Sequence, residues 1–175
     1  MSTDPWSAKR GDTPKERLAY WLAVWFGVGL LPFAPGTWGS LVALVLGLPI
    51  LKFYGPSGLA IAIVIVMIAG IWASGLHQQI SGLHDRGEVV IDEVVGQWIT
   101  LLPLGFFTVT QSETLDIFLA FLLFRGFDII KPWPIDIMDL RLKGGRGVML
   151  DDVAAGLFAA AVLGLLAIGI PGRQM

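Results

Sequence analysis

The chain is poor in the residues on which several kinds of protein chemistry depend. Its 175 residues include no cysteine and only two histidines, which excludes disulfide frameworks, thiol nucleophiles and zinc sites built from cysteine and histidine. Charged residues make up 15% of the chain, against roughly 25% in ordinary soluble domains. The formal net charge of −2 provides no basic excess for binding nucleic acid. The few charged residues must therefore carry most of any chemistry.

Long stretches of the chain carry no charge at all. Such gaps lie between Arg17 and Lys52 and over residues 94–112 and 153–172. They suit a bilayer, because a helix needs about 20 mostly apolar residues to cross the hydrocarbon core. We therefore predict an all-α fold, a multi-pass membrane helical bundle of about four to five apolar helices. The predicted helices cover residues 37–53, 59–77, 94–107, 115–127 and 153–170.

An earlier apolar run, residues 18–31, ends at Pro32 and Pro35. Proline cannot continue a helix, so this run is a membrane span, a re-entrant segment or an interfacial helix, and the sequence leaves the three open. We divide the chain into a polar N-terminal segment, residues 1–17, expected in the cytoplasm, and a single helical membrane domain, residues 18–175.

The basic residues predict how the bundle is oriented, because cytoplasmic loops carry an excess of lysine and arginine. If the first predicted helix runs outward, nine of the 12 basic residues lie on the inner side and only Lys52 and Arg173 lie outside. We therefore predict a protein of the cytoplasmic membrane whose site faces the cytoplasm. The inner group comprises Lys9, Arg10, Lys15, Arg17, Arg86, Lys131, Arg141, Lys143 and Arg146.

The same topology gathers five acids at the cytoplasmic end of the bundle. Two adjacent pairs are each expected to open an apolar helix, where acids stabilise the helix dipole by about 0.3 to 1 kcal/mol each, so capping is the plain alternative. Carboxylates held close together repel one another unless a cation neutralises them. Oxygen ligands without cysteine favour a hard cation, and Mg²⁺ is the expected one. The five predicted ligands are Asp92, Glu93, Asp128, Asp151 and Asp152.

Three cations accompany these acids. Arg125, Asp128 and Lys131 are spaced three residues apart, which places them near one face of a helix. Either Arg125 and Lys131 supply positive charge to a phosphate group, or they form structural ion pairs with Asp128. Arg146, in a glycine-rich segment expected to be a flexible break, is a further candidate for binding substrate or a solvated loop residue.

A proline- and glycine-containing turn at residues 32–41 runs into the first predicted helix. Thr37 and Ser40 are each suited to cap that helix. The free amides of a helix N-terminus also form a site for an anion. We therefore count Thr37 and Ser40 among the candidate substrate-binding residues, with capping as the alternative.

Taken together, four motifs resemble the phosphatidylglycerophosphatase A family in order and spacing. The resemblance covers nearly everything from about Leu18 to the C-terminus. It implies a membrane-embedded, Mg²⁺-dependent phosphatase of the bacterial inner membrane that converts phosphatidylglycerophosphate to phosphatidylglycerol, and Asp92, Glu93, Asp128, Lys131, Asp151 and Asp152 match the family's motif positions. The motifs are GVGLLPFAPGTWGS at 27–40, HDRGEVVIDEVVGQWIT at 84–100, FRGFDIIKPWPI at 124–135 and GGRGVMLDDVAAG at 144–156.

These observations lead to a hypothesis for the reaction. The carboxylates hold one or two Mg²⁺ ions that activate an attacking water, and Lys131 with Arg125 neutralises the phosphoryl oxygens. Asp92 or Asp151 serves as the base, Asp128 belongs to the catalytic set, and an aspartyl-phosphate intermediate stays an open alternative. The partners expected are the lipid substrate and the bilayer, with no nucleic acid, and the oligomeric state stays open. The rival functions are another lipid-phosphate phosphatase, a small cation carrier and a non-catalytic membrane subunit.

Overall fold

The structure is a computed structural model, and it describes residues 13–81, 87–137 and 144–169. Within these ranges every regular element is a helix, and none of the described residues lies in a strand. The prediction of an all-helical fold is therefore confirmed.

The apolar run at residues 18–31 is divided between two short elements. Helix α2 (Pro14–Ala23) begins with a capping box, in which Thr13 Oγ1 accepts from the Glu16 backbone N–H at 3.3 Å and Glu16 Oε2 accepts from the Thr13 N–H at 3.0 Å. It ends at Val24, and the irregular 3₁₀ segment η1 (Trp25–Leu30) follows. The run is thus not one continuous helix.

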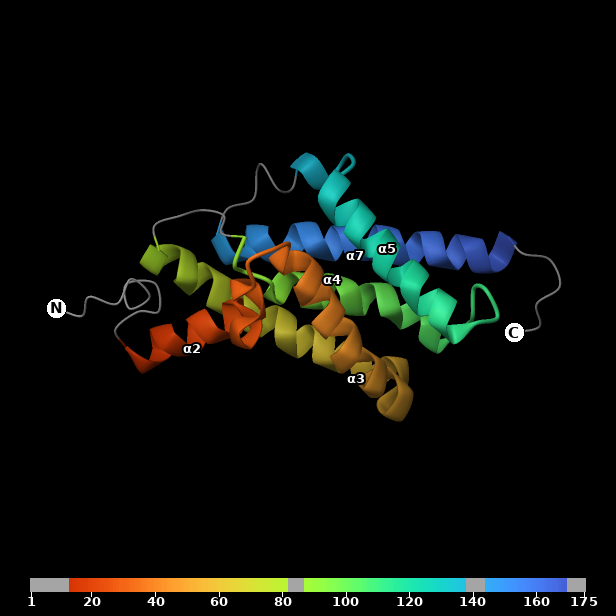
Figure 1. Cartoon of the computed structure of the whole chain (residues 1–175), viewed down its shortest axis with the longest axis horizontal. Coiled ribbons are helices and arrows are strands. Elements are labelled where there is room, and N and C mark those ends of the chain that lie inside the picture. Colours follow the sequence, from red (N-terminus) through yellow and green to blue (C-terminus); the bar gives the residue numbers. More distant parts are fainter. Residues whose placement is uncertain (1–12, 82–86, 138–143, 170–175) are drawn as a thin grey trace.

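Helix α3 (Pro35–Ser81) contains the first two predicted apolar helices as two arms. Gly55 interrupts it with a φ of 67°, a left-handed conformation that glycine adopts without steric cost. Pro56 follows directly. In Figure 1 the orange first arm runs away from α2 and the yellow second arm returns, so α3 forms a helical hairpin. The interval between the predicted helices at 37–53 and 59–77 is this bend.

The central helix of the bundle is α4 (Ile91–Leu101), which continues into the 3₁₀ turn η2 (Leu102–Gly105). Nine of its 11 residues are buried. The Trp98 indole Nε1 donates to the Ala43 carbonyl at 2.7 Å and so ties α4 to the first arm of α3. Helix α5 (Glu113–Ile130) crosses over α7 (Gly144–Gly169) (Figure 1).

Helix α7 begins nine residues before the predicted position, so the expected break at residues 144–147 is wrong. The glycines there serve close packing instead. A Cβ on Gly145 would lie 2.0 Å from the Ile71 carbonyl oxygen of α3. Because only glycine permits this approach, the tertiary contact outweighs the cost of glycine in a helix, about 1 kcal/mol.

Among the described residues, two helices, α3 and α7, are long and apolar enough to cross a membrane. In their most apolar stretches only 22% and 33% of the residues are buried, whereas the core helix of a soluble protein is mostly buried. The outward side chains on the second arm of α3 are large and apolar, among them Ile61, Val64, Ile65 and Ile68. Exposed surface of this kind suits contact with lipid rather than water.

Candidate active site

The site depends on a glycine contact between α4 and α7. A Cβ on Gly156 would lie 2.5 Å from the Gly96 carbonyl oxygen, and a Cβ on Gly96 would lie 2.7 Å from the Asp152 carbonyl oxygen. Thr100 Oγ1 donates to the carbonyls of Gly96 at 3.0 Å and Gly156 at 3.3 Å. Small residues at facing positions let helix backbones touch. Glu93 lies one turn before Gly96 and Asp152 one turn before Gly156, so the contact brings both carboxylates together.

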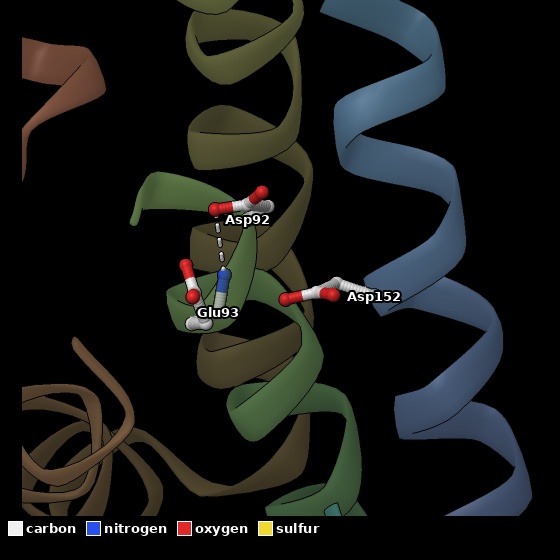
Figure 2. Close-up of side chains that lie close together, drawn as sticks. All are labelled: Asp92, Glu93 and Asp152. Carbon is white, nitrogen blue, oxygen red and sulfur yellow. Dashed lines mark hydrogen bonds between the residues drawn. The ribbon is translucent and has the colours of Figure 1, made fainter. Parts of the chain in front are cut away.

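Three acids from these two helices form a cluster. Asp92 and Glu93 lie in the first turn of α4, and Asp152 projects from α7 toward them (Figure 2). One carboxylate oxygen from each lies within 4.8 Å of the others. Asp152 is buried and the other two are partly buried. Such spacing lets the three oxygens bind one small cation.

The chemistry of the cluster fits a hard divalent cation. Glu93 Oε2 and Asp152 Oδ2 are buried and lack a hydrogen-bond partner among the described residues, and a buried polar atom without a partner costs free energy. A bound cation would satisfy both oxygens. The ligand atoms are all carboxylate oxygens, which Mg²⁺ prefers over nitrogen and sulfur donors.

The two acids of α4 do not ionise readily without a cation. Burial raises the pKa of Glu93 to about 8, with Asp152 and Asp128 adding to the effect, although a hydrogen bond with Asp92 and the charge of Arg125 oppose it. Burial also raises the pKa of Asp92 well above its ordinary value, and Glu93 and Asp151 add to that shift. A cation that bound the cluster at near-neutral pH would therefore displace protons from it.

An arginine on α5 reaches the cluster. Arg125 Nη1 forms a close ion pair with Asp128 Oδ2 and lies 4.0 Å from Glu93 Oε1. Arg125 and Asp128, the first two of the three residues predicted to share a helix face, thus lie side by side. The N-terminus of α3 also lies here, because a Cβ on Gly36 would be 2.2 Å from Glu93 Oε1 and 3.1 Å from Arg125 Nη1.

Lys131 pairs with Asp151, the last of the five predicted acids to be placed. It is the C-cap of α5 in a left-handed conformation, with φ 44° and ψ 60°, which is uncommon for residues other than glycine. From this position its Nζ donates to Asp151 Oδ2 at 2.7 Å. The lysine therefore joins the end of α5 to α7 beside the cluster.

Two expectations about helix starts are wrong. Asp151 and Asp152 are the eighth and ninth residues of α7 and do not open it, so dipole capping does not explain this pair. Helix α3 begins at Pro35, so neither Thr37 nor Ser40 is its N-cap. Ser40 is buried and its Oγ donates back to the Gly36 carbonyl at 2.9 Å.

The remaining predicted substrate-binding residues, Thr37 and Arg146, differ in their exposure. Thr37 is partly buried in the first turn of α3, next to Gly36. Arg146 is exposed in the first turn of α7. Gly36, which touches both Glu93 and Arg125, is a site residue that sequence reasoning missed; its only signal is the glycine of the PGT turn before α3.

The fold and the cluster define a class: apolar helical proteins in which two helices bring a partly buried group of acids together beside an arginine and a lysine. Residues 21–167 match the family described as phosphatidylglycerophosphatase A. A phosphatidylglycerophosphatase A of Haemophilus influenzae is 39% identical over 81% of this chain and 84% of its own length. That of Escherichia coli is 34% identical over 87% and 88%. The chain belongs to the phosphatidylglycerophosphatase A family.

One relative carries a different name. A protein of Bacteroides thetaiotaomicron, provisionally named a phosphatidylinositol-3-phosphatase, is 39% identical over 77% of this chain and 84% of its own length. No solved structure matches the chain.

Proposed function

We propose that the chain is a phosphatidylglycerophosphate phosphatase that uses its acidic cluster to hydrolyse the terminal phosphomonoester, giving phosphatidylglycerol and inorganic phosphate. Membership of the phosphatidylglycerophosphatase A family supports the reaction. The observation that carries the mechanism is the three-carboxylate cluster of Asp92, Glu93 and Asp152.

The cluster would hold Mg²⁺. When bound, this ion supplies a Lewis acid that draws charge from the phosphoryl oxygens and lowers the pKa of water. Asp92, Glu93 and Asp152 would be the first ligands, because their oxygens converge. Asp128 and Asp151 border the cluster, and both act electrostatically on its members, so each is positioned to bind a second ion or a water.

Asp92 is the better of the two candidate bases. Asp151 is engaged by Lys131 at 2.7 Å, and a paired carboxylate is a weaker proton acceptor. Burial raises the pKa of Asp92 in the metal-free chain, so an Asp92 oxygen that does not hold the ion would be the stronger proton acceptor. It takes one proton from the attacking water as the water oxygen bonds to phosphorus. The bond from phosphorus to the glycerol oxygen breaks, and Asp92 returns the proton to that oxygen, which leaves as the alcohol.

Positive charge for the phosphate comes from α5. Arg125 lies 4.0 Å from Glu93, and its planar guanidinium suits two phosphoryl oxygens at once. Lys131 supplies a second charge beside Asp151. Thr37, Ser40 and Arg146 are the further candidates, with Thr37 in the first turn of α3, where helix amides favour an anion.

The chain is expected to be a multi-pass protein of the bacterial cytoplasmic membrane with the cluster facing the cytoplasm. The low burial of α3 and α7 supports a membrane location. With the cluster at the interface, acyl chains stay in the bilayer while the headgroup reaches the carboxylates.

The test is phosphate release from phosphatidylglycerophosphate by the purified chain in detergent, with Mg²⁺ and with a chelator. We expect activity that requires Mg²⁺ and falls at least about 100-fold in Asp152→Asn, on the scale of losing one transition-state contact, with Asp128→Asn strongly impaired. Full Mg²⁺-dependent activity in both variants would contradict the mechanism.

A second substrate is favoured by one observation, the relative provisionally named a phosphatidylinositol-3-phosphatase. The cluster recognises a phosphomonoester and would accept one on another lipid headgroup. A panel of phosphatidylglycerophosphate, phosphatidic acid and phosphatidylinositol 3-phosphate, compared by kcat/KM, separates the two assignments.

A further inference from the structure

The segment that leads into α4 is held by a buried histidine from the far arm of α3. His77 is 1% exposed, and its Nε2 lies 3.2 Å from Glu88 Oε1. With Glu88 ionised, its carboxylate only accepts hydrogen bonds and the imidazole Nε2 is the donor. Tyr20 of α2 packs on the same ring, with 5.5 Å between ring centroids. His77 therefore links three segments of the chain.

Two backbone contacts also hold the same segment. The Val90 N–H donates to the Ala23 carbonyl at 3.0 Å. A Cβ on Gly29 would lie 1.8 Å from the Glu88 carbonyl oxygen, so the backbones of η1 and residue 88 touch. Residues 88–90 are thus fixed by α2, η1 and α3 immediately before α4 begins.

The start of α4 carries two of the three clustered acids. Asp92 follows Glu88 by four residues, and Val90 is the N-cap of α4 without a side-chain capping bond. The position of the first turn consequently depends on tertiary contacts rather than on a local cap. A shift of that turn would move the Asp92 and Glu93 carboxylates away from Asp152.

We propose that His77 is a positioning residue for the acidic cluster: by holding Glu88 it sets where α4 begins and so brings Asp92 and Glu93 within binding distance of Asp152. This inference deepens the proposed function and rests on it, since it requires the cluster to bind a divalent cation. His77 acts through Glu88 and touches neither the cation nor the substrate.

The experiment measures cation binding directly, by Mn²⁺ titration of the purified full chain in detergent, followed by electron paramagnetic resonance. His77→Leu removes the donor, whereas His77→Gln retains an N–H at a similar reach. The control is Asp116→Asn, which weakens the hydrogen bonds between a buried carboxylate in the first turn of α5 and the loop before it. Asp116 is 2% exposed and accepts from the Val109 and Thr110 N–H groups, each at 2.7 Å.

We expect the Mn²⁺ Kd of His77→Leu to rise about tenfold, in the range found for groups that orient metal ligands, and His77→Gln to restore most of the affinity. Asp116→Asn should lower the Tm with the Kd unchanged. The inference is overturned if His77→Leu lowers only the Tm, or if His77→Gln binds as weakly as His77→Leu. Wild-type chain that binds no Mn²⁺ would instead overturn the proposed metal site itself.

Discussion

At the residue scale, Gly36 controls where the Glu93 carboxylate can lie. A methyl group there would be 2.2 Å from Glu93 Oε1, the end of a side chain that can move away. Gly36→Ala should therefore keep the fold but weaken Mg²⁺ activation about tenfold or more, as expected for a displaced ligand. The measurement is the Mg²⁺ concentration for half-maximal phosphate release. Gly126→Ala, whose methyl group meets nothing within 4 Å, is the matched control and should retain wild-type activation.

Glu93 makes the stability of the metal-free protein depend on pH. Its pKa is about 8 in the folded chain, raised from 4.5 chiefly by burial. Between these values the folded state holds a proton that the unfolded state has lost, so stability should fall as pH rises from about 4.5 to about 8. Added Mg²⁺ should restore stability mainly at the upper end.

Thermal denaturation in detergent with a chelator, at pH 5 to 8.5, tests this dependence. Glu93→Gln should flatten the decline of Tm with pH, although Asp92 shifts in the same direction and leaves part of it. A Tm that is level across this range in the metal-free wild-type chain would contradict the prediction.

At the scale of elements, the contact between α4 and α7 allows little change. Gly156→Ala places a methyl group 2.5 Å from the Gly96 carbonyl oxygen, and backbone cannot yield as a side chain does. The expected cost is about 1 to 3 kcal/mol of stability, together with loss of activity because Asp152 moves from Glu93. In the same helix, a methyl group on Gly164 would have Phe107 at 3.9 Å as its nearest neighbour. Gly164→Ala should be neutral or slightly stabilising in the same Tm and activity measurements.

At the scale of the whole molecule, membrane topology can be tested cleanly because the chain has no cysteine. Tyr54, beside the bend of α3, is 74% exposed, and Trp133, just after α5, is 75% exposed. With the acidic cluster facing the cytoplasm, a membrane-impermeant maleimide should label Tyr54→Cys in intact spheroplasts and Trp133→Cys only after permeabilisation. The reverse pattern would contradict the proposed orientation.

The sequence predicts the helices well where packing follows apolar content, and less well where glycine intervenes. The segments at 37–53, 59–77 and 115–127 lie within α3 and α5 of the structure. The segment at 94–107 turns into η2 around Pro103. Gly144 to Gly147 reads as a break because glycine disfavours isolated helices, yet α7 starts there because Gly145 packs directly on α3. The helix propensity of residues 144–147 carries no information about the α3 backbone against which Gly145 packs.

The sequence by itself determined the class of this protein. The positions of the charge-free stretches and of the few acids can be read directly from the sequence, and they suffice to predict an apolar helical bundle in which several acids gather. Only the tertiary structure decided how the five acids divide. Asp92, Glu93 and Asp152 converge, while Asp128 pairs with Arg125 and Asp151 with Lys131. The convergence of Glu93 and Asp152 depends on the contact between Gly96 and Gly156, which are 60 residues apart in the sequence. The place along two helices where they touch determines which of their side chains meet.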